Sequence, residues 1–198
     1  MASAVNLNGV ECTVTDGELQ CIDDDGIREC PIGDVVIPNN TGLTSIGEQA
    51  FLMCSGLTSV TFPEGLTSIG YNAFQGTGLT SVTFSEGLTS IRDSAFSECT
   101  GLTSVTFPEG LTHIRRGAFS SCSSLTSIEL PSSLYYIGDY AFHDAAPLTS
   151  LFYKGSKPTL TYGSMPECSP GSCTEGIAWS NCDGLKTAYR GSCGCGSA

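Results

Sequence analysis

Basic residues and long apolar segments are what this 198-residue chain has least of. It holds 8 Lys and Arg residues against 20 Asp and Glu residues, which gives a formal net charge of −12. This balance argues against nucleic acid as a partner, because phosphate backbones are bound through clusters of Lys and Arg. No apolar run approaches the roughly 18–20 residues needed to cross a bilayer, so we expect no membrane insertion.

Side chains that carry out catalysis are also scarce. The two histidines, His113 and His143, lie in no nucleophile or metal motif. The acidic run Asp23-Asp24-Asp25 lacks the alternating oxygen ligands of a calcium loop. We therefore predict that the protein is not an enzyme and that it holds neither a cofactor nor a metal ion.

Cysteine, by contrast, is abundant, and most of the eleven cysteines lie towards the two ends of the chain. Such a number is ordinary in an exported protein and unusual in the cytosol. Zinc binding by Cys193-x-Cys195 is an alternative, but paired C-x₂-C motifs are missing, so disulfides are favoured. The candidates for disulfides are Cys12, Cys21, Cys30, Cys54, Cys99, Cys122, Cys168, Cys173, Cys182, Cys193 and Cys195. We predict an extracellular or cell-surface protein, or alternatively one in the lumen of an exported or organellar compartment.

The middle of the chain is an internal repeat with a period of 22 or 23 residues, marked by recurring Ala-Phe pairs. Each unit begins with L-T-S-V-T-F, whose alternation of apolar and polar residues is typical of a half-buried strand. Pro-Glu-Gly then turns the chain, because Pro cannot continue a strand ladder and Gly tolerates positive φ. We expect the Ala-Phe pair to lie in a short helical or 3₁₀ turn.

One such unit cannot bury its apolar face alone, so the units must stack on one another. We predict a solenoid of the α/β leucine-rich-repeat type, with a parallel β-sheet on its concave side and the short helical turns on the other. Residues 32–153 would form about five to six turns. An acidic, cysteine-containing cap would precede them at residues 1–31, and a cysteine-rich cap would follow at residues 154–198.

The repeated unit resembles a known family. The pattern L-T-S-I…A-F…C…L-T-S-V-T-F-P-E-G over residues 32–153 closely resembles the BspA-type leucine-rich repeats of bacterial and protist surface proteins. It differs from the commoner leucine-rich repeat in lacking the Asn that follows the strand. The resemblance implies a surface or secreted protein that acts in adhesion and binding.

The outward positions of the predicted sheet form rows of hydroxyl side chains. Ser and Thr simply suit exposed strand positions, which is one explanation for these rows. A second is a polar platform for a partner, with a distinctive end formed by Glu129, Phe152 and Tyr153. A third is an ice-binding surface, although the rows read Ser-x-Thr and not Thr-x-Thr. The other candidate positions are Ser59, Thr61, Ser81, Thr83, Ser104, Thr106 and Ser127.

Each repeat has a second apolar element after the Pro-Glu-Gly turn, such as Leu66…Ile69. The segment that follows this element varies freely between copies. Arg115 and Arg116, next to His113, make the only basic spot on this acidic chain. A solvated ridge or a surface that selects partners both account for this variation. Asn39-Asn40-Thr41 is the only glycosylation sequon, and we expect Asn39 to be exposed and to carry a glycan in a eukaryotic source that exports the protein.

Cysteines stacked in adjacent turns lie about 5 Å apart, which is within reach of a disulfide. Cys30–Cys54 and Cys99–Cys122 are therefore able to pair, whereas Cys54–Cys99 spans two turns and should not. A ladder of buried free thiols is the alternative for these repeat cysteines. We expect Cys12–Cys21 as the natural N-terminal pair, with two bridges and one remaining thiol among the five C-terminal cysteines.

These observations lead to two functional hypotheses. The first is a non-catalytic interaction or adhesion module that binds a protein or glycan partner through its repeat surface. The second is a permanent structural subunit of a larger complex. A fixed subunit should bury an apolar footprint once its partner is present, whereas a free binding module should be soluble alone and present a polar sheet.

Overall fold

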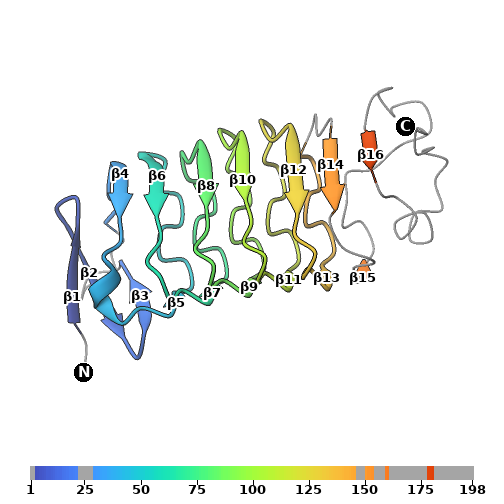
Figure 1. Cartoon of the computed structure of the whole chain (residues 1–198). Helices are drawn as coiled ribbons and strands as arrows, with labels where there is room; N and C mark the ends of the chain where they lie inside the picture. Colours follow the sequence, from blue (N-terminus) through green and yellow to red (C-terminus); the bar gives the residue numbers. More distant parts are fainter. Residues whose placement is uncertain (1–2, 22–28, 146–149, 154–158, 161–177, 181–198) are drawn as a thin grey trace.

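The computed structural model describes residues 3–21, 29–145, 150–153, 159–160 and 178–180. Within them the chain coils into a solenoid in which each turn contributes one strand to each of two sheets (Figure 1). Successive turns follow one another along the long axis in chain order. The predicted solenoid with a parallel sheet is therefore confirmed.

The first sheet is formed by the L-T-S-V-T-F segments and has seven parallel strands in the described part of the chain. Its inward residues, such as Val82 and Val105, are buried, and the Ser and Thr on either side of them are exposed. The strands are β4 (Gly33–Val36), β6 (Leu57–Thr61), β8 (Ser81–Thr83), β10 (Ser104–Thr106), β12 (Ser127–Leu130), β14 (Ser150–Tyr153) and β16 (Ala178–Ser180).

A second sheet, of nine strands among the described residues, runs along the opposite side. Its repeat strands are two residues long, and each contributes a buried Ile or Leu where that side chain is described. They are β5 (Ser45–Ile46), β7 (Ser68–Ile69), β9 (Ser90–Ile91), β11 (His113–Ile114), β13 (Tyr136–Ile137) and β15 (Thr159–Leu160). The sequence analysis treated these residues only as a second apolar element.

Three N-terminal strands cover the start of the solenoid. Strands β1 (Ser3–Leu7), β2 (Val10–Thr15) and β3 (Glu18–Gln20) form an antiparallel meander, and β3 then pairs in parallel with β5. The meander extends the second sheet, so the acidic N-terminal segment takes the place of a preceding turn. The predicted C-terminal cap, residues 154–198, lies outside the described residues apart from β15 and β16.

The expected helical turns are replaced by consecutive hydrogen-bonded turns. In the first repeat, Leu52 N–H donates to Gln49 O and Cys54 N–H donates to Phe51 O. The alternate residues Phe51 and Met53 donate to the next coil instead, to the carbonyl oxygens of Ala73 and Gln75. Gln49 and Met53 have positive φ, which interrupts helical geometry. The only 3₁₀ helix among the described residues is Asn39–Thr41.

The interior is organised around two ladders of phenylalanine. The rings of Phe74 and Phe96 stack with their centroids 5.1 Å apart, and Phe96 stacks on Phe119 at 5.2 Å. Phe84 meets Phe96 edge to face at 5.6 Å, which ties the first sheet to the turn side. The turn-side ladder consists of Phe51, Phe74, Phe96, Phe119 and Phe142, all fully buried.

Candidate functional site

The register of the first sheet aligns its outward side chains in two rows. Ser81 pairs with Ser104 and Thr83 with Thr106, so equivalent residues stand one above another from turn to turn. One row consists of Asp34, Ser59, Ser81, Ser104 and Ser127. The other consists of Val36, Thr61, Thr83, Thr106 and Glu129.

The backbone register pairs Phe152 with Glu129 and Tyr153 with Leu130, a buried residue that follows Glu129 in β12. The side chains of Phe152 and Tyr153 lie outside the described part of the structure, so the distinctive end of the sheet stays a prediction.

The Thr of the L-T-S triplet has a structural role in several repeats. Thr103 Oγ1 donates to the carbonyl oxygen of Thr80, one turn earlier, at 2.9 Å. A parallel series runs along the second sheet, where Thr89 Oγ1 donates to Thr67 O at 3.1 Å and Thr112 Oγ1 donates to Thr89 O at 2.9 Å. These hydroxyls hold consecutive turns together and are occupied by the fold.

The Ser-x-Thr hydroxyls of the outward rows behave differently. Those of Ser59, Thr61, Ser81 and Thr83 form no hydrogen bond with any other described residue. The same four side chains line a shallow groove of about 350 Å³ between β6 and β8, with the Phe62 and Phe84 residues beneath them. The sheet therefore presents hydroxyl groups that the fold itself does not use.

The two arginines of the basic spot both lie against tyrosine rings. Arg115 Cζ lies 5.6 Å from the ring centroid of Tyr136, and Arg116 Cζ lies 5.9 Å from that of Tyr140. Both arginines are exposed. Contacts of this kind are attractive because the face of an aromatic ring carries partial negative charge.

Each histidine contacts the side chain of a neighbouring residue in the chain. His143 Nδ1 lies 3.0 Å from Asp144 Oδ2, and His113 Nδ1 lies 2.8 Å from Thr112 Oγ1. Among the described residues, no group of three or more His, Cys, Asp or Glu residues is arranged to hold a metal ion. In the same part of the chain, no helix is long and apolar enough to span a bilayer.

Two disulfides and two free thiols account for the described cysteines. Cys12–Cys21 closes the N-terminal meander with its Cα atoms 4.3 Å apart, and Cys30–Cys54 joins adjacent turns at 5.2 Å. Cys99 and Cys122 are free and buried. Burial is the largest cause that raises the pKa of both thiols. Their low reactivity in this environment fits a packing role. The five C-terminal cysteines lie outside the described residues.

Asn39 is exposed, as its sequon requires, but it begins the 3₁₀ helix and does not lie in an open loop. Its Oδ1 atom accepts a hydrogen bond from the backbone N–H of Glu64 in the next turn, at 2.8 Å. Glycosylation of Asn39 remains a prediction.

Comparison with known proteins gives the same architecture. Residues 20–153 match the family model of the BspA type leucine-rich repeat region, with six copies of the repeat. The chain belongs to the BspA-type leucine-rich repeat family. It is similar in structure to a leucine-rich repeat protein of Treponema pallidum, with a TM-score of 0.61 and 26% identity over 83% of this chain and 84% of that one. No curated protein matches the chain.

Other bacterial structures of this BspA-type fold are more distant. The pneumococcal vaccine antigen PcpA has a TM-score of 0.50 and 24% identity, covering 76% of this chain and 36% of that one. A leucine-rich cell surface protein of Faecalibacterium prausnitzii has a TM-score of 0.49 and 22% identity, covering 79% of this chain and 56% of that one.

Sequence reasoning missed the tyrosines that surround the basic spot of this BspA-type chain. Tyr135 and Tyr136 replace the Thr-Ser of earlier repeats, and Tyr140 occupies a position held by Gln49 or Asn72 in earlier turns. Comparing the repeats position by position would have found this signal, because three substitutions to Tyr fall within a single repeat.

Proposed function

We propose that this protein is a non-catalytic interaction module that binds a protein or glycan partner through the outward rows of its seven-stranded sheet. The observation that carries the proposal is that some hydroxyl groups form hydrogen bonds within the fold whereas those of the outward rows do not. The Thr103 hydroxyl is occupied by the preceding turn, whereas those of Ser81 and Thr83 have no partner among the described residues. Unused hydroxyls in register offer both donors and acceptors to a ligand.

The spacing of the rows supports an extended ligand. Neighbouring parallel strands lie about 4.8 Å apart, so each row repeats a hydroxyl at that interval along the solenoid. One hydrogen bond contributes only about 0.5–1.5 kcal/mol, so useful affinity requires several turns to act together. A glycan chain or a peptide segment lying along the solenoid axis would meet this requirement.

An extracellular or cell-surface location is part of the proposal. The Cys12–Cys21 and Cys30–Cys54 disulfides support it, because structural disulfides persist in oxidising compartments. Leucine-rich repeats of this family are in general not enzymes, which supports a binding role.

The alternative of a permanent subunit finds less support in the composition of the sheet. Obligate interfaces have apolar cores, whereas the central outward residues here are Ser and Thr. The large exposed apolar side chains described near the N-terminal turns are Ile32, Val36 and Met53. Of these, only Val36 stands in an outward row of this sheet.

A binding screen with matched variants tests the proposed surface. The full chain is applied to an array of extracellular-matrix proteins and of neutral and acidic glycans, together with Thr83→Arg and Thr100→Arg variants whose melting temperatures match the wild type. Thr83 lines the groove, and Thr100 lies exposed on a turn away from it. We expect Thr83→Arg to weaken binding at least tenfold and Thr100→Arg to leave it unchanged. Equal binding by both variants, or no binding by the wild type, would contradict the proposal.

A further inference from the structure

The basic spot formed by Arg115 and Arg116 is surrounded by tyrosine side chains. We define the basic–aromatic patch as His113, Arg115, Arg116, Tyr135, Tyr136 and Tyr140. It lies on the second sheet and the adjoining turns, in the fourth and fifth repeats. In earlier turns the row that holds His113 contains Ser45, Ser68 and Ser90.

Contacts within the patch hold its cationic groups against the rings. The ring of His113 lies 5.9 Å from that of Tyr136 and 6.2 Å from that of Tyr135, and the guanidinium of Arg115 lies over Tyr136 at 5.6 Å. Tyr135 nevertheless remains 63% exposed. The patch therefore presents an open ring face next to positioned hydrogen-bond donors.

The guanidinium groups of Arg115 and Arg116 remain able to bind an anion. Among the described residues, neither Arg115 nor Arg116 forms an ion pair with a carboxylate, and the one such contact there joins His143 and Asp144. A guanidinium held over a ring still directs its N–H donors outward, where they match a carboxylate or a sulfate.

The surroundings of the patch restrict the shape of that anion. Backbone hydrogen bonds between Ser94 and Arg116 and between Gly117 and Asp139 place Asp93 and Asp139 in the turns on either side of Arg116. These acids, and the net charge of −12, repel a broad anionic surface such as a bilayer or a duplex. A thin chain that carries its charge locally avoids that repulsion.

We propose that the basic–aromatic patch binds an acidic oligosaccharide, with a carboxylate or sulfate group on Arg115 and a pyranose ring against Tyr135. This site lies on the second sheet, so the inference goes beyond the function proposed for the first sheet. Carbohydrate fits better than an acidic peptide because exposed Tyr rings, which a purely electrostatic site does not need, offer apolar area to the C–H face of a sugar.

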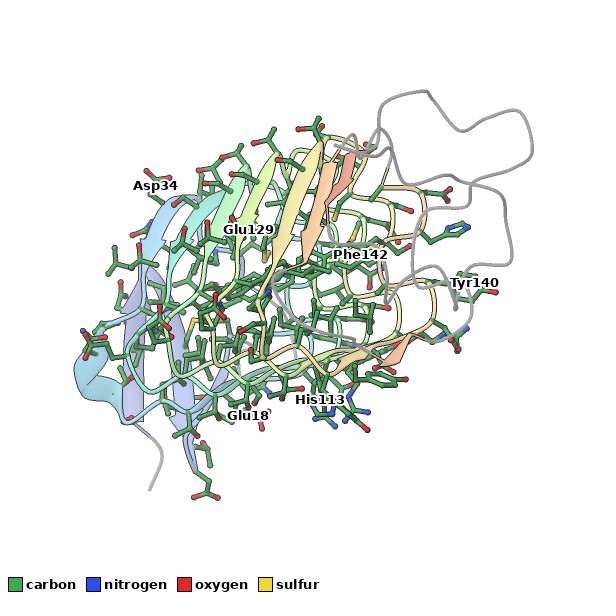
Figure 2. All side chains as sticks on the ribbon, turned by 45° about the vertical axis from the view of Figure 1, so that its right-hand side comes forward. Glu18, Asp34, His113, Glu129, Tyr140 and Phe142 are labelled. Atoms are coloured by element: carbon green, nitrogen blue, oxygen red, sulfur yellow. A yellow bond between two sulfur atoms is a disulfide. The ribbon has the colours of Figure 1, made fainter. Side chains whose placement is uncertain are left out.

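The row that leads away from the patch can accept the rest of the chain. From His113 the second sheet continues through Ser90, Ser68 and Ser45 to Glu18, so hydroxyls follow the cationic end at every turn. Figure 2 shows Glu18 and His113 on the same lower side of the solenoid, with Asp34 on the upper side. The acidic end at Glu18 gives the row a polarity that would orient an anionic ligand.

The test measures binding of the full chain to heparin-derived and polygalacturonate oligosaccharides by calorimetry, with neutral dextran and poly-glutamate as comparison probes. The variants are Arg115→Gln, Tyr135→Ala and, as a matched control, Met53→Ala. Met53 is, like Tyr135, a large exposed apolar side chain, but it lies in the first repeat, away from the patch. We expect Arg115→Gln and Tyr135→Ala each to weaken binding to at least one acidic oligosaccharide tenfold or more. Met53→Ala should change it less than threefold.

The outcomes separate this inference from the function proposed for the first sheet. Equal losses in Met53→Ala and Tyr135→Ala, tighter binding of poly-glutamate, or an unchanged affinity in Tyr135→Ala would each overturn the acidic-sugar site. So would failure of both acidic oligosaccharides to bind. Loss of array binding in Thr83→Arg would still support the sheet as a binding surface in any of those cases.

Discussion

The Sγ atom of Cys122 donates a hydrogen bond to the carbonyl oxygen of Phe96, one turn earlier in the solenoid, at 3.1 Å. Cys99 makes the same bond to Phe74. In the repeat before Cys99 the position is held by Thr77, whose hydroxyl donates to the carbonyl oxygen of Phe74 in its own turn. A small side chain with a weak donor is therefore what this buried position requires, and a thiol meets that need without a disulfide.

Because these thiols are buried, alkaline pH should destabilise the protein. Burial raises the pKa of both thiols above the ordinary value of 9.0, so above about pH 9 the unfolded state loses protons that the folded state retains. The free energy of unfolding should be insensitive to these groups below that pH and should fall above it. Urea melts from pH 7 to 10.5 should show a shallower fall in Cys122→Ala, which imitates Ala145 of the next turn, than in the wild type. Parallel curves would contradict the assignment.

A buried phenylalanine, a hydrogen-bonded threonine and an exposed threonine should contribute differently to stability. Phe96→Ala removes a fully buried ring from the ladder and should cost about 3–5 kcal/mol of unfolding free energy. Thr89→Ala loses the hydrogen bond to Thr67 O and should cost about 1 kcal/mol. Thr83→Ala removes an exposed hydroxyl without a described partner and should stay within about 0.5 kcal/mol. Denaturant melts measure all three free energies of unfolding. Equal losses of stability in Thr83→Ala and Thr89→Ala would contradict the assignment of one hydroxyl as bonded and the other as unbonded.

The 22-residue repeat, one residue shorter than the others, depends on Gly78. A Cβ atom on Gly78 would overlap with the backbone carbonyl oxygen of Ser55, whereas on Gly101, the equivalent residue one turn later, it would stay 3.5 Å from Leu79 O. Gly78→Ala should therefore destabilise the protein by about 1–3 kcal/mol. Gly101→Ala should be neutral or stabilise it by up to about 1 kcal/mol. Thermal melts of the two variants decide between this account and one in which both positions tolerate a methyl group.

A second backbone prediction concerns the turns that face away from the first sheet. Ser121 has a φ of 59°, whereas Ser123, two residues further on, is not among the residues with positive φ. Glycine relieves the strain of a left-handed conformation and otherwise only adds freedom to the unfolded chain. Ser121→Gly should therefore be more stable than Ser123→Gly by about 1–2 kcal/mol in chemical denaturation. The reverse order would mean that the turn geometry is incorrect.

Much of this architecture was predictable from the repeat. The spacing of the Ala-Phe pairs correctly predicted the stacking of Phe74 on Phe96, and the same register brings Cys30 and Cys54 within bonding distance. The second sheet was not predicted, because a strand as short as Ser68–Ile69 has no alternation to detect and forms only when a neighbouring turn supplies its partner.

The candidate site was only partly predictable for a related reason. Period-2 alternation places Ser81 and Thr83 outward, but no local signal shows that Thr103 is occupied by the Thr80 carbonyl. The helical turn expected at the Ala-Phe pair is wrong, because the chain there forms consecutive hydrogen-bonded turns. The residues with positive φ, such as Gln49, share no residue type across the repeats, because backbone hydrogen bonds between turns impose this conformation.

Every part of the account depends on the register that stacks Ser81 on Ser104, and engineered disulfides test it most directly. Ser81 and Ser104 are partners across β8 and β10, about 5 Å apart, whereas Ser81 and Thr106 are offset by two residues and lie about 7–8 Å apart or more. The double variants Ser81→Cys/Ser104→Cys and Ser81→Cys/Thr106→Cys are oxidised under native conditions and mapped by non-reducing peptide mass spectrometry. The account predicts a bond between positions 81 and 104 and none between positions 81 and 106. A bond between 81 and 106 with none between 81 and 104 would contradict it.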